Sequence, residues 1–303
     1  MKRLSYISLF LFISVVYLYS SGVTGGQMLK LGMGAKSAGL ANTFLSVSDD
    51  PSAIYYNPAG VTQSLQPNIS LTHMNRIVDI LSFDVSAVLP LSNKKEALGC
   101  GGYVLYSKDI IREEETGNEL GYFMNYNTYI ILTYAKEITP KLSLGFNTKF
   151  VYILLQDFQS SNTAIDISAL YTMSNKLIFG LVIQNISTGL KFTNEVETIP
   201  LGLKLGGVYK FTCMTITFDI CKYEDANTNF GVGVEYLLYP KIVKNFAIRT
   251  GYRYKPENFY IGGLTGFSFG FGLEVGKYQI DYAYTPYGTL ENLQNRLSIS
   301  RKF

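Results

Sequence analysis

Apolar and polar residues alternate along most of this 303-residue chain, from about residue 67 to its C-terminus. In one such stretch, Phe267, Phe269 and Phe271 alternate with Ser268 and Gly270. Successive side chains of a β-strand point to opposite faces, so each stretch predicts a strand with one apolar and one polar face. About fourteen such segments follow one another without a helical pattern between them. The pattern therefore predicts an all-β protein.

A soluble β-sandwich would also alternate, with its apolar face turned inward. Two features favour a transmembrane antiparallel β-barrel of about 14 strands instead. The segments run for about ten residues, enough to cross a bilayer at a tilt, whereas soluble strands average about five to six. Many also end in Tyr or Phe, which gather at membrane interfaces, and the chain holds 24 Tyr, 19 Phe and no Trp. The polar faces would then line the lumen.

The connections between the predicted strands differ in length at the two ends of the barrel. Short turns are expected near Ser92, Pro140, Ser174 and Gly276, and longer polar links at 110–121, 185–199 and 254–263. Outer-membrane barrels have short periplasmic turns and longer outer loops, so this alternation fits a bacterial outer membrane. The chain ends in Phe303, and we expect this aromatic residue to be part of the signal that the barrel-assembly machinery reads.

The first residues indicate export. Lys2 and Arg3 precede an apolar run over about 9–19, and small residues follow up to Gly22. The run is shorter than the roughly 20 residues of a transmembrane helix, so 1–22 is predicted to be a secretory signal peptide. We expect residues 23–66 to form a hatch inside the lumen and residues 67–303 to form the barrel. The lipids of the outer membrane are then the barrel's surroundings.

Composition excludes several kinds of chemistry. The net charge of +3 is too small to indicate a nucleic-acid partner. The cysteines Cys100, Cys213 and Cys221 have no CxxC spacing, and His73 is the only histidine. A zinc site or a Cys–His nucleophile therefore has little support, and the sequence predicts no enzyme, no cofactor and no metal. Whether any cysteines pair stays open at this point.

Residues 23–66 do not alternate cleanly, and glycines and small residues dominate them. Asp49 and Asp50 precede a Pro-Ser pair, a sequence suited to helix capping and Asx turns. Asn57 precedes Pro58, which biases Asn57 toward an extended or turn conformation. These features predict a compact, turn-rich plug with one short helix. Asn57 either only locks a turn or also holds the plug in place. The candidate hatch motif consists of Asp49, Asp50, Asn57, Pro58, Ala59 and Gly60.

The stretch GMGAKSAGLANTFLSVSDDPSAIYYNPAG, at 32–60, resembles the N-terminal signature of FadL-like outer-membrane proteins. It is most similar to the PorV/PorQ subgroup, and the last stretch, YQIDYAYTPYGTLENLQNRLSISRKF, is similar to the final hairpin of that subgroup. The resemblance implies a monomeric barrel with an internal hatch that contains Asn57, Pro58 and Ala59. The chain departs from the fatty-acid transporters in being shorter and in lacking long helical insertions. It also has Ser48 where relatives commonly have Ala.

Two functions remain open. The first is a passive channel or transporter for hydrophobic or amphipathic small molecules, whose partner would be a hydrophobic ligand. The second is a PorV-like accessory with a secretion-system partner, or a structural surface barrel without transport. The charged residues on the lumen parity either line a path or only satisfy one another. They are Asp84, Lys149, Asp166, Lys204, Asp219, Glu235, Arg249, Arg253, Glu274, Asp281 and Arg296.

Overall fold

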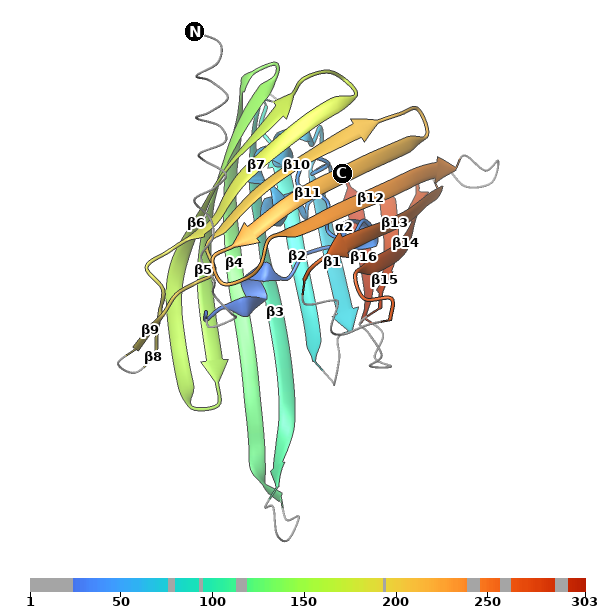
Figure 1. The fold of residues 1–303 in the computed structure, drawn as a ribbon. Helices are drawn as coiled ribbons and strands as arrows, with labels where there is room; N and C mark the ends of the chain where they lie inside the picture. The colour runs from blue at the N-terminus through green and yellow to red at the C-terminus, as the bar shows by residue number, and fades with distance from the viewer. Residues whose placement is uncertain are drawn as a thin grey trace.

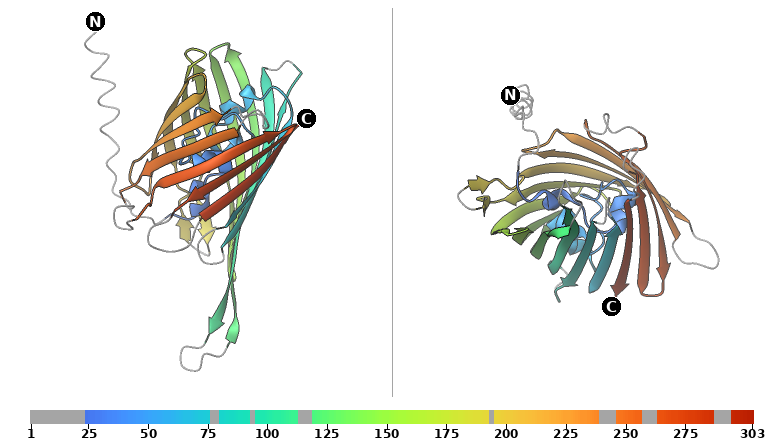
Figure 2. Two further views of the ribbon diagram at one scale, coloured as in Figure 1. Left: turned by 90° about the vertical axis from the view of Figure 1, so that its right-hand side faces the viewer. Right: turned by 90° about the horizontal axis from the view of Figure 1, so that it is seen from below.

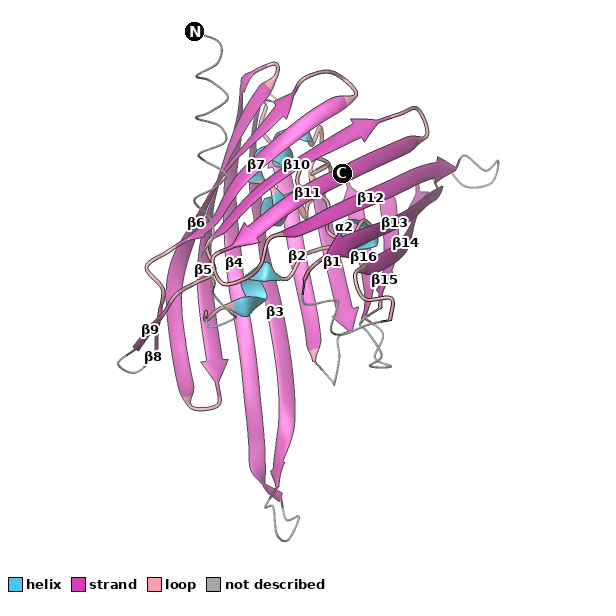
Figure 3. Cartoon of the chain, viewed as in Figure 1, coloured by secondary structure: helices cyan, strands magenta, loops and turns pink. Residues whose placement is uncertain are grey.

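The computed structural model describes residues 24–75, 80–92, 95–112, 119–192, 195–238, 246–256, 263–286 and 294–303. Within these residues, fourteen antiparallel strands close into a barrel, in which β1 pairs with both β2 and β16 (Figures 1 and 3). The predicted all-β transmembrane barrel is confirmed. The predicted signal peptide lies outside the described residues and stays a prediction.

The wall strands follow the chain order, except that β7 pairs with β10. Their bounds are β1 (Asn68–Asn75), β2 (Leu81–Pro90), β3 (Glu96–Arg112), β4 (Glu119–Thr139), β5 (Leu142–Leu155), β6 (Phe158–Thr172), β7 (Leu177–Ile186), β10 (Gly202–Lys210), β11 (Met214–Tyr223), β12 (Asn229–Leu238), β13 (Phe246–Tyr254), β14 (Phe267–Val275), β15 (Tyr278–Thr285) and β16 (Gln294–Lys302). Between β7 and β10, the strands β8 (Leu190–Phe192) and β9 (Glu195–Glu197) form a separate small sheet.

The predicted parity of the strands is confirmed by exposure. In β14, Phe267, Phe269 and Phe271 are 40%, 42% and 44% exposed, whereas Ser268 is 1% exposed. The apolar residues therefore cover the outside of the barrel, as lipid contact requires. His73 also lies on this outer face, where its ring centroid is 4.7 Å from that of Phe83.

The prediction of a polar link at 110–121 is wrong in extent. β3 continues to Arg112 and β4 begins at Glu119, with a register shift between Ile111 and Arg112. The hairpin of β3 and β4 consequently extends far beyond the other strands, at the end of the barrel opposite to the C-terminus (Figure 1). The predicted turns near Pro140, Ser174 and Gly276 lie at the C-terminal end. In the turn near Ser92 and the link 254–263, residues 93–94 and 257–262 lie outside the described residues.

Residues 24–66, here called the inner segment, lie within the barrel (Figure 2). They form four short helices rather than the single one that the sequence predicts. These are η1 (Gln27–Lys30), α2 (Ala35–Gly39), α3 (Ala53–Tyr56) and η2 (Pro58–Gln63). Phe44 and Ile54 are fully buried and share one apolar core with the wall residues Tyr103, Tyr129 and Ile131. No helix among the described residues is both long and apolar enough to span a membrane.

Glycines on the inside of the wall let the backbone of the inner segment approach closely. A Cβ at Gly145 would collide with the backbone nitrogen of Ala59, and one at Gly251 would lie 2.7 Å from the carbonyl carbon of Leu40. A Cβ at Gly180, Gly233 or Gly270 would likewise approach backbone atoms of the inner segment, whereas one at Gly99, Gly101 or Gly206 would meet the side chain of Ile54 or Leu45. We call this set, with Gly145 and Gly251, the glycine ring. It fixes the inner segment against many strands at once.

Candidate functional site

The Asn57–Pro58–Ala59 motif joins two parts of the inner segment to the wall. Asn57 is fully buried, and its side-chain amide donates to the carbonyl oxygens of Leu45 at 2.9 Å and Ala169 at 3.3 Å. Its side-chain oxygen accepts from the backbone of Ala59 at 3.1 Å. The same Ala59 N–H donates to Ser168 Oγ at 2.9 Å. Asn57 therefore locks the turn that starts η2 and also holds the inner segment to β6.

Asp49 and Asp50 occupy the turn before α3. Asp49 pairs with Lys36 at 2.7 Å, and Asp50 accepts from the backbone N–H of Ser52 at 2.8 Å. The second contact is the Asx-type turn that the sequence predicts. Burial raises the pKa of Asp50 to about 6. Gly60, the last residue of the motif, leaves no room for a Cβ beside Ser48.

Two buried ion networks lie in the lumen. In the first, Lys149 and Asp166 pair at 2.8 Å, and neither side chain is exposed. Asn147 links this pair to the inner segment, because its side-chain amide donates to Asp166 at 2.8 Å and to the carbonyl oxygen of Ile54 at 2.7 Å. Asn185 accepts from Lys149 at 2.8 Å. This network joins β5, β6 and β7 to α3.

In the second network, Arg249 bridges Glu235 and Asp281, at 2.6 Å to each carboxylate. The arginine is 2% exposed, and it packs beside Gly39 at the end of α2. These two networks account for five of the predicted lumen charges, and within them the charges satisfy one another. A buried pair of this kind is costly to break, because the remaining charge loses its partner.

The other predicted lumen residues mostly hold the inner segment. Two carboxylates accept from its backbone N–H groups: Asp84 from Gly34 at 3.3 Å, and Asp219 from Leu45 at 3.4 Å. Two guanidinium groups donate to its carbonyl oxygens: Arg296 to Gly32 at 2.8 Å, and Arg253 to Ala41 at 2.7 Å. The ammonium of Lys204 lies 5.3 Å and 5.2 Å from the ring centroids of Tyr55 and Tyr223. Glu274 differs, since it lies near the barrel rim, 3.8 Å from Lys302, with 28% of its side chain exposed.

Three adjoining cavities surround the beginning of the inner segment. The first has a volume of about 630 Å³, and its lining is largely apolar, including Met28, Leu31, Leu105 and Ile153. The second and third have volumes of about 390 Å³ and 440 Å³ and share six lining residues with each other. Leu31 lines all three cavities. The three spaces therefore meet at the end of η1.

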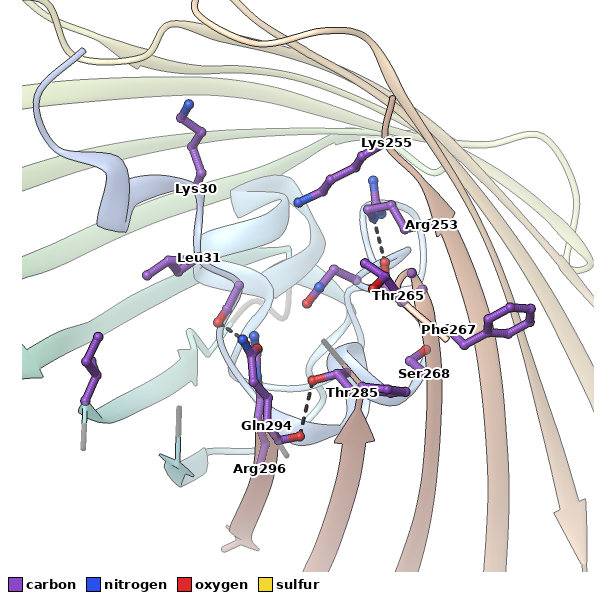
Figure 4. A pocket seen from close by; sticks show the side chains of 16 residues that line it. Lys30, Leu31, Arg253, Lys255, Thr265, Phe267, Ser268, Thr285, Gln294 and Arg296 are labelled. Atoms are coloured by element: carbon purple, nitrogen blue, oxygen red, sulfur yellow. Dashed lines mark hydrogen bonds between the residues drawn. The ribbon is translucent and has the colours of Figure 1, made fainter. Parts of the chain in front are cut away.

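The second and third cavities are lined by basic side chains. The cations are Lys30, Lys204, Arg253, Lys255 and Arg296. Figure 4 shows the third cavity, in which Lys255 reaches from the end of β13 across the inner segment. In the same view Arg296 contacts the chain next to Leu31, through its bond to the Gly32 carbonyl. An apolar space thus opens beside a cationic one.

At this junction η1 is held by apolar packing of Met28 and Leu29, by a hydrogen bond from the Tyr55 hydroxyl to the Leu29 carbonyl at 3.0 Å, and by one carboxylate. Asp225, in the link between β11 and β12, accepts from Lys30 at 2.7 Å and Gln27 at 2.8 Å, and also from the Thr24 hydroxyl. We call these four residues the Asp225 latch. Burial alone would raise the pKa of Asp225, but the hydrogen bonds from Lys30, Thr24 and Gln27 outweigh it and lower that pKa. The sequence did not predict the latch, because no local pattern marks its members.

No group of His, Cys, Asp and Glu in the described part of the chain could hold a metal ion. The three cysteines are free thiols. His73 faces outward on β1, away from the cavities.

Comparison with known proteins gives a result for structure alone. No model of a known protein family matches the chain, and no curated protein matches it. The toluene transporter TbuX of Ralstonia pickettii has a TM-score of 0.65 and 13% identity, over 90% of this chain and 98% of its own. The monoaromatic hydrocarbon channel CymD has the same score and coverages at 16% identity. A FadL homologue of Pseudomonas aeruginosa has a TM-score of 0.60 and 10% identity, over 94% of this chain and 99% of its own.

The chain therefore has the fold of these transport proteins, and its architecture indicates the bacterial outer membrane. TbuX is described as a transporter and CymD as a channel. The predicted FadL-like fold is confirmed. The finer resemblance to the PorV/PorQ subgroup is not shown by these structures.

Proposed function

We propose that this protein is a passive outer-membrane channel for hydrophobic or amphipathic small molecules, and that the inner segment is its hatch. The observation that carries this proposal is the apolar cavity that meets two cationic ones at Leu31. Ligand sites are typically concave spaces of about 300–1,000 Å³ with apolar walls and a few polar groups. The cavity of about 630 Å³ falls within that range.

The lining favours molecules with two chemically different parts. An apolar part would lie against Leu105 and Ile153, which are each 8% exposed. A polar or anionic part would lie among Lys30, Lys255 and Arg296. Removing apolar surface from water contributes roughly 25 cal/mol per Å². A neutral hydrocarbon would gain only the burial of apolar surface, whereas an amphipathic anion would also gain the attraction of the basic side chains.

The centre of the lumen supports a route beside the inner segment rather than an open pore. Tyr103 and Tyr129 stack with ring centroids 5.3 Å apart and are buried, and Lys149 is fully buried in its pair with Asp166. A solute that enters the apolar cavity therefore meets packed side chains unless η1 moves. The inner segment therefore restricts passage to molecules that fit the cavities, whereas a general porin has an open, water-filled pore.

The test is uptake by liposomes that contain the purified protein. A naphthalenesulfonate dye serves as the amphipathic probe and naphthalene as the neutral one, with empty liposomes as the control. Phe158→Ser should slow uptake, because Phe158 lines the apolar cavity and is 56% exposed, so the change spares the core. Phe211→Ser is the matched change, since Phe211 is 49% exposed at the other end of the barrel. No uptake of either probe above the control would refute the channel and favour a secretion accessory or a structural barrel.

A further inference from the structure

The lipid-facing row of the last strand ends in a cation. Leu297 and Ile299 of β16 are 44% and 48% exposed, and Arg301 follows on the same face. Its guanidinium lies 4.6 Å from the ring centroid of Phe303 and 5.6 Å from that of Tyr278, its cross-strand partner. Arg301 is therefore held on the outer surface by two aromatic rings and does not point into the lumen.

The position of Arg301 fixes a depth in the membrane. An Arg on the lipid face of a barrel strongly destabilises the fold at the bilayer midplane but is tolerated near an interface. Aromatic rings gather at the same interfaces, at the level of the headgroups. Tyr278 and Phe303, which are 48% and 54% exposed, thus place Arg301 among the headgroups.

Further cations surround this end of the barrel. Lys141, Lys176 and Lys277 lie in three of its short turns, and all three are exposed. The backbone N–H of Lys302 donates to the Lys277 carbonyl at 3.0 Å, which brings this turn beside the end of β16. Lys136 also lies on an outer face, in β4.

The carboxylates that the structure describes in the wall at this end offset only part of this positive charge. They are Glu96, Glu137 and Glu274, and all are partly buried. Glu96 pairs with Lys136 at 2.7 Å, and Glu274 lies 3.8 Å from Lys302. The outer surface at this end is therefore basic, and its Arg301–Lys277 corner combines two cations with two aromatic rings.

We propose that this end of the barrel binds anionic phospholipid headgroups of the adjoining leaflet, with its main site at Arg301 and Lys277. A guanidinium recognises phosphate by paired hydrogen bonds. The ammonium of Lys277 adds a second charge, and the rings of Tyr278 and Phe303 offer an apolar surface to the start of the acyl chains. Clusters of Lys and Arg beside a membrane attract anionic lipids by about 1 kcal/mol per residue, or about fivefold in affinity.

The experiment titrates the purified full-length barrel, in uncharged detergent, with fluorescent phosphatidylglycerol and follows its anisotropy. Arg301→Gln and Lys277→Gln should each weaken binding by about fivefold. Lys191→Gln is the matched control, because Lys191 is an exposed lysine in β8 at the opposite end, and it should leave the affinity unchanged. Fluorescent phosphatidylcholine should bind more weakly than phosphatidylglycerol.

Several results would overturn the proposal. One is unchanged phosphatidylglycerol affinity in the Arg301→Gln/Lys277→Gln double variant when gel mobility shows a folded barrel. Another is equal binding of phosphatidylcholine and phosphatidylglycerol by the unaltered protein. Binding of peptidoglycan fragments at these residues in place of phosphatidylglycerol would reassign the surface to the cell wall.

Discussion

Removal of the Asp225 carboxylate should release the beginning of the inner segment. Asp225→Asn keeps the shape of the side chain but removes its charge, so Lys30 loses its ion pair and the contacts of Gln27 and Thr24 weaken. The rest of the inner segment stays bound by Asn57 and by the glycine ring. The expected motion is therefore a local opening of η1.

The magnitude follows from the geometry of the latch. A hydrogen bond to a charged group contributes about 1.5–3 kcal/mol, and bonds to one carboxylate do not add fully. The Asp225 side chain is 0% exposed and that of Lys30 is 17% exposed, so water screens the pair only in part. We take about 3 kcal/mol as the free energy by which the whole latch stabilises the closed position of η1. Its loss corresponds to about a hundredfold increase in the population of the open state.

The assay measures access to Met28, which is 4% exposed beside Gln27 in η1. Met28→Cys is introduced in a background in which the three native cysteines are replaced by alanine, and maleimide labelling is timed. Asp225→Asn should accelerate labelling by about a hundredfold if opening precedes reaction. Asp157→Asn, an exposed carboxylate in the β5–β6 turn at the same end, is the control.

The pH dependence of labelling gives a second readout. The pKa of Asp225 is lowered by its hydrogen bonds, below an ordinary value of about 3.9. Its stabilisation is therefore fully present above that value and is lost as the pH falls through the lowered pKa. Because maleimide reacts with the thiolate, both labelling rates fall in acid, and the ratio of the Asp225→Asn rate to the parent rate is the readout. That ratio should approach one only in that acid range. Equal labelling rates in the parent and in Asp225→Asn, with the barrel folded, would refute the latch.

Four further outcomes are expected. Gly145→Ala should lower the temperature at which the barrel loses its heat-modifiable gel mobility, because the new methyl group collides with Ala59; unchanged mobility would contradict the close approach. Phe269→Arg should lower the free energy of unfolding by about 2–4 kcal/mol in a folding titration, because it places a charge on the lipid face. An unchanged free energy of unfolding would place this residue outside the membrane. Burial raises the pKa of Asp50 to about 6, so its ionisation destabilises the fold as the pH rises from about 4 through 6. Asp50→Asn should remove that part of the pH dependence of thermal stability, and identical profiles of the parent and the variant would exclude this role of Asp50. Phe303→Ser should reduce the amount of membrane-inserted protein in cells, and unchanged insertion would show that the terminal aromatic is dispensable for assembly.

The wall of the barrel could be predicted because lipid imposes one rule on it. Side chains that face the hydrocarbon are mostly apolar, so Phe269 and Ser268 could be assigned to opposite faces from alternation alone. The rule ends where the membrane ends. Beyond it, β3 continues to Arg112 and β4 begins at Glu119, although the sequence there looks like a polar loop. Pairing between backbones sustains this hairpin, and backbone pairing leaves little signal in the residue types.

The interior could be predicted only in part. Polar residues were predicted to line the lumen, but the pattern did not say what they contact: Ser268 is buried, and its hydroxyl donates to the Gly39 carbonyl at 3.1 Å. The latch was missed for a related reason. Lys30 and Asp225 are 195 positions apart, and only the path of the inner segment brings them together. Alternation reports which face a residue lies on, but it does not report what lies opposite that face.

The way in which the inner segment is held also limits how the channel can open. Deletion of residues 27–60 should not leave an intact empty barrel. Asn147 and Ser168 would lose backbone partners, and the apolar core around Tyr103 would lose the buried side chains that the inner segment contributes, Phe44 and Ile54 among them. Expulsion of the whole segment would break the same interactions together. η1 lines the cavities, and its side-chain contacts with the β11–β12 link all end at the Asp225 carboxylate, so loss of that charge is the change that we expect to loosen it against the packing of Met28 and Leu29.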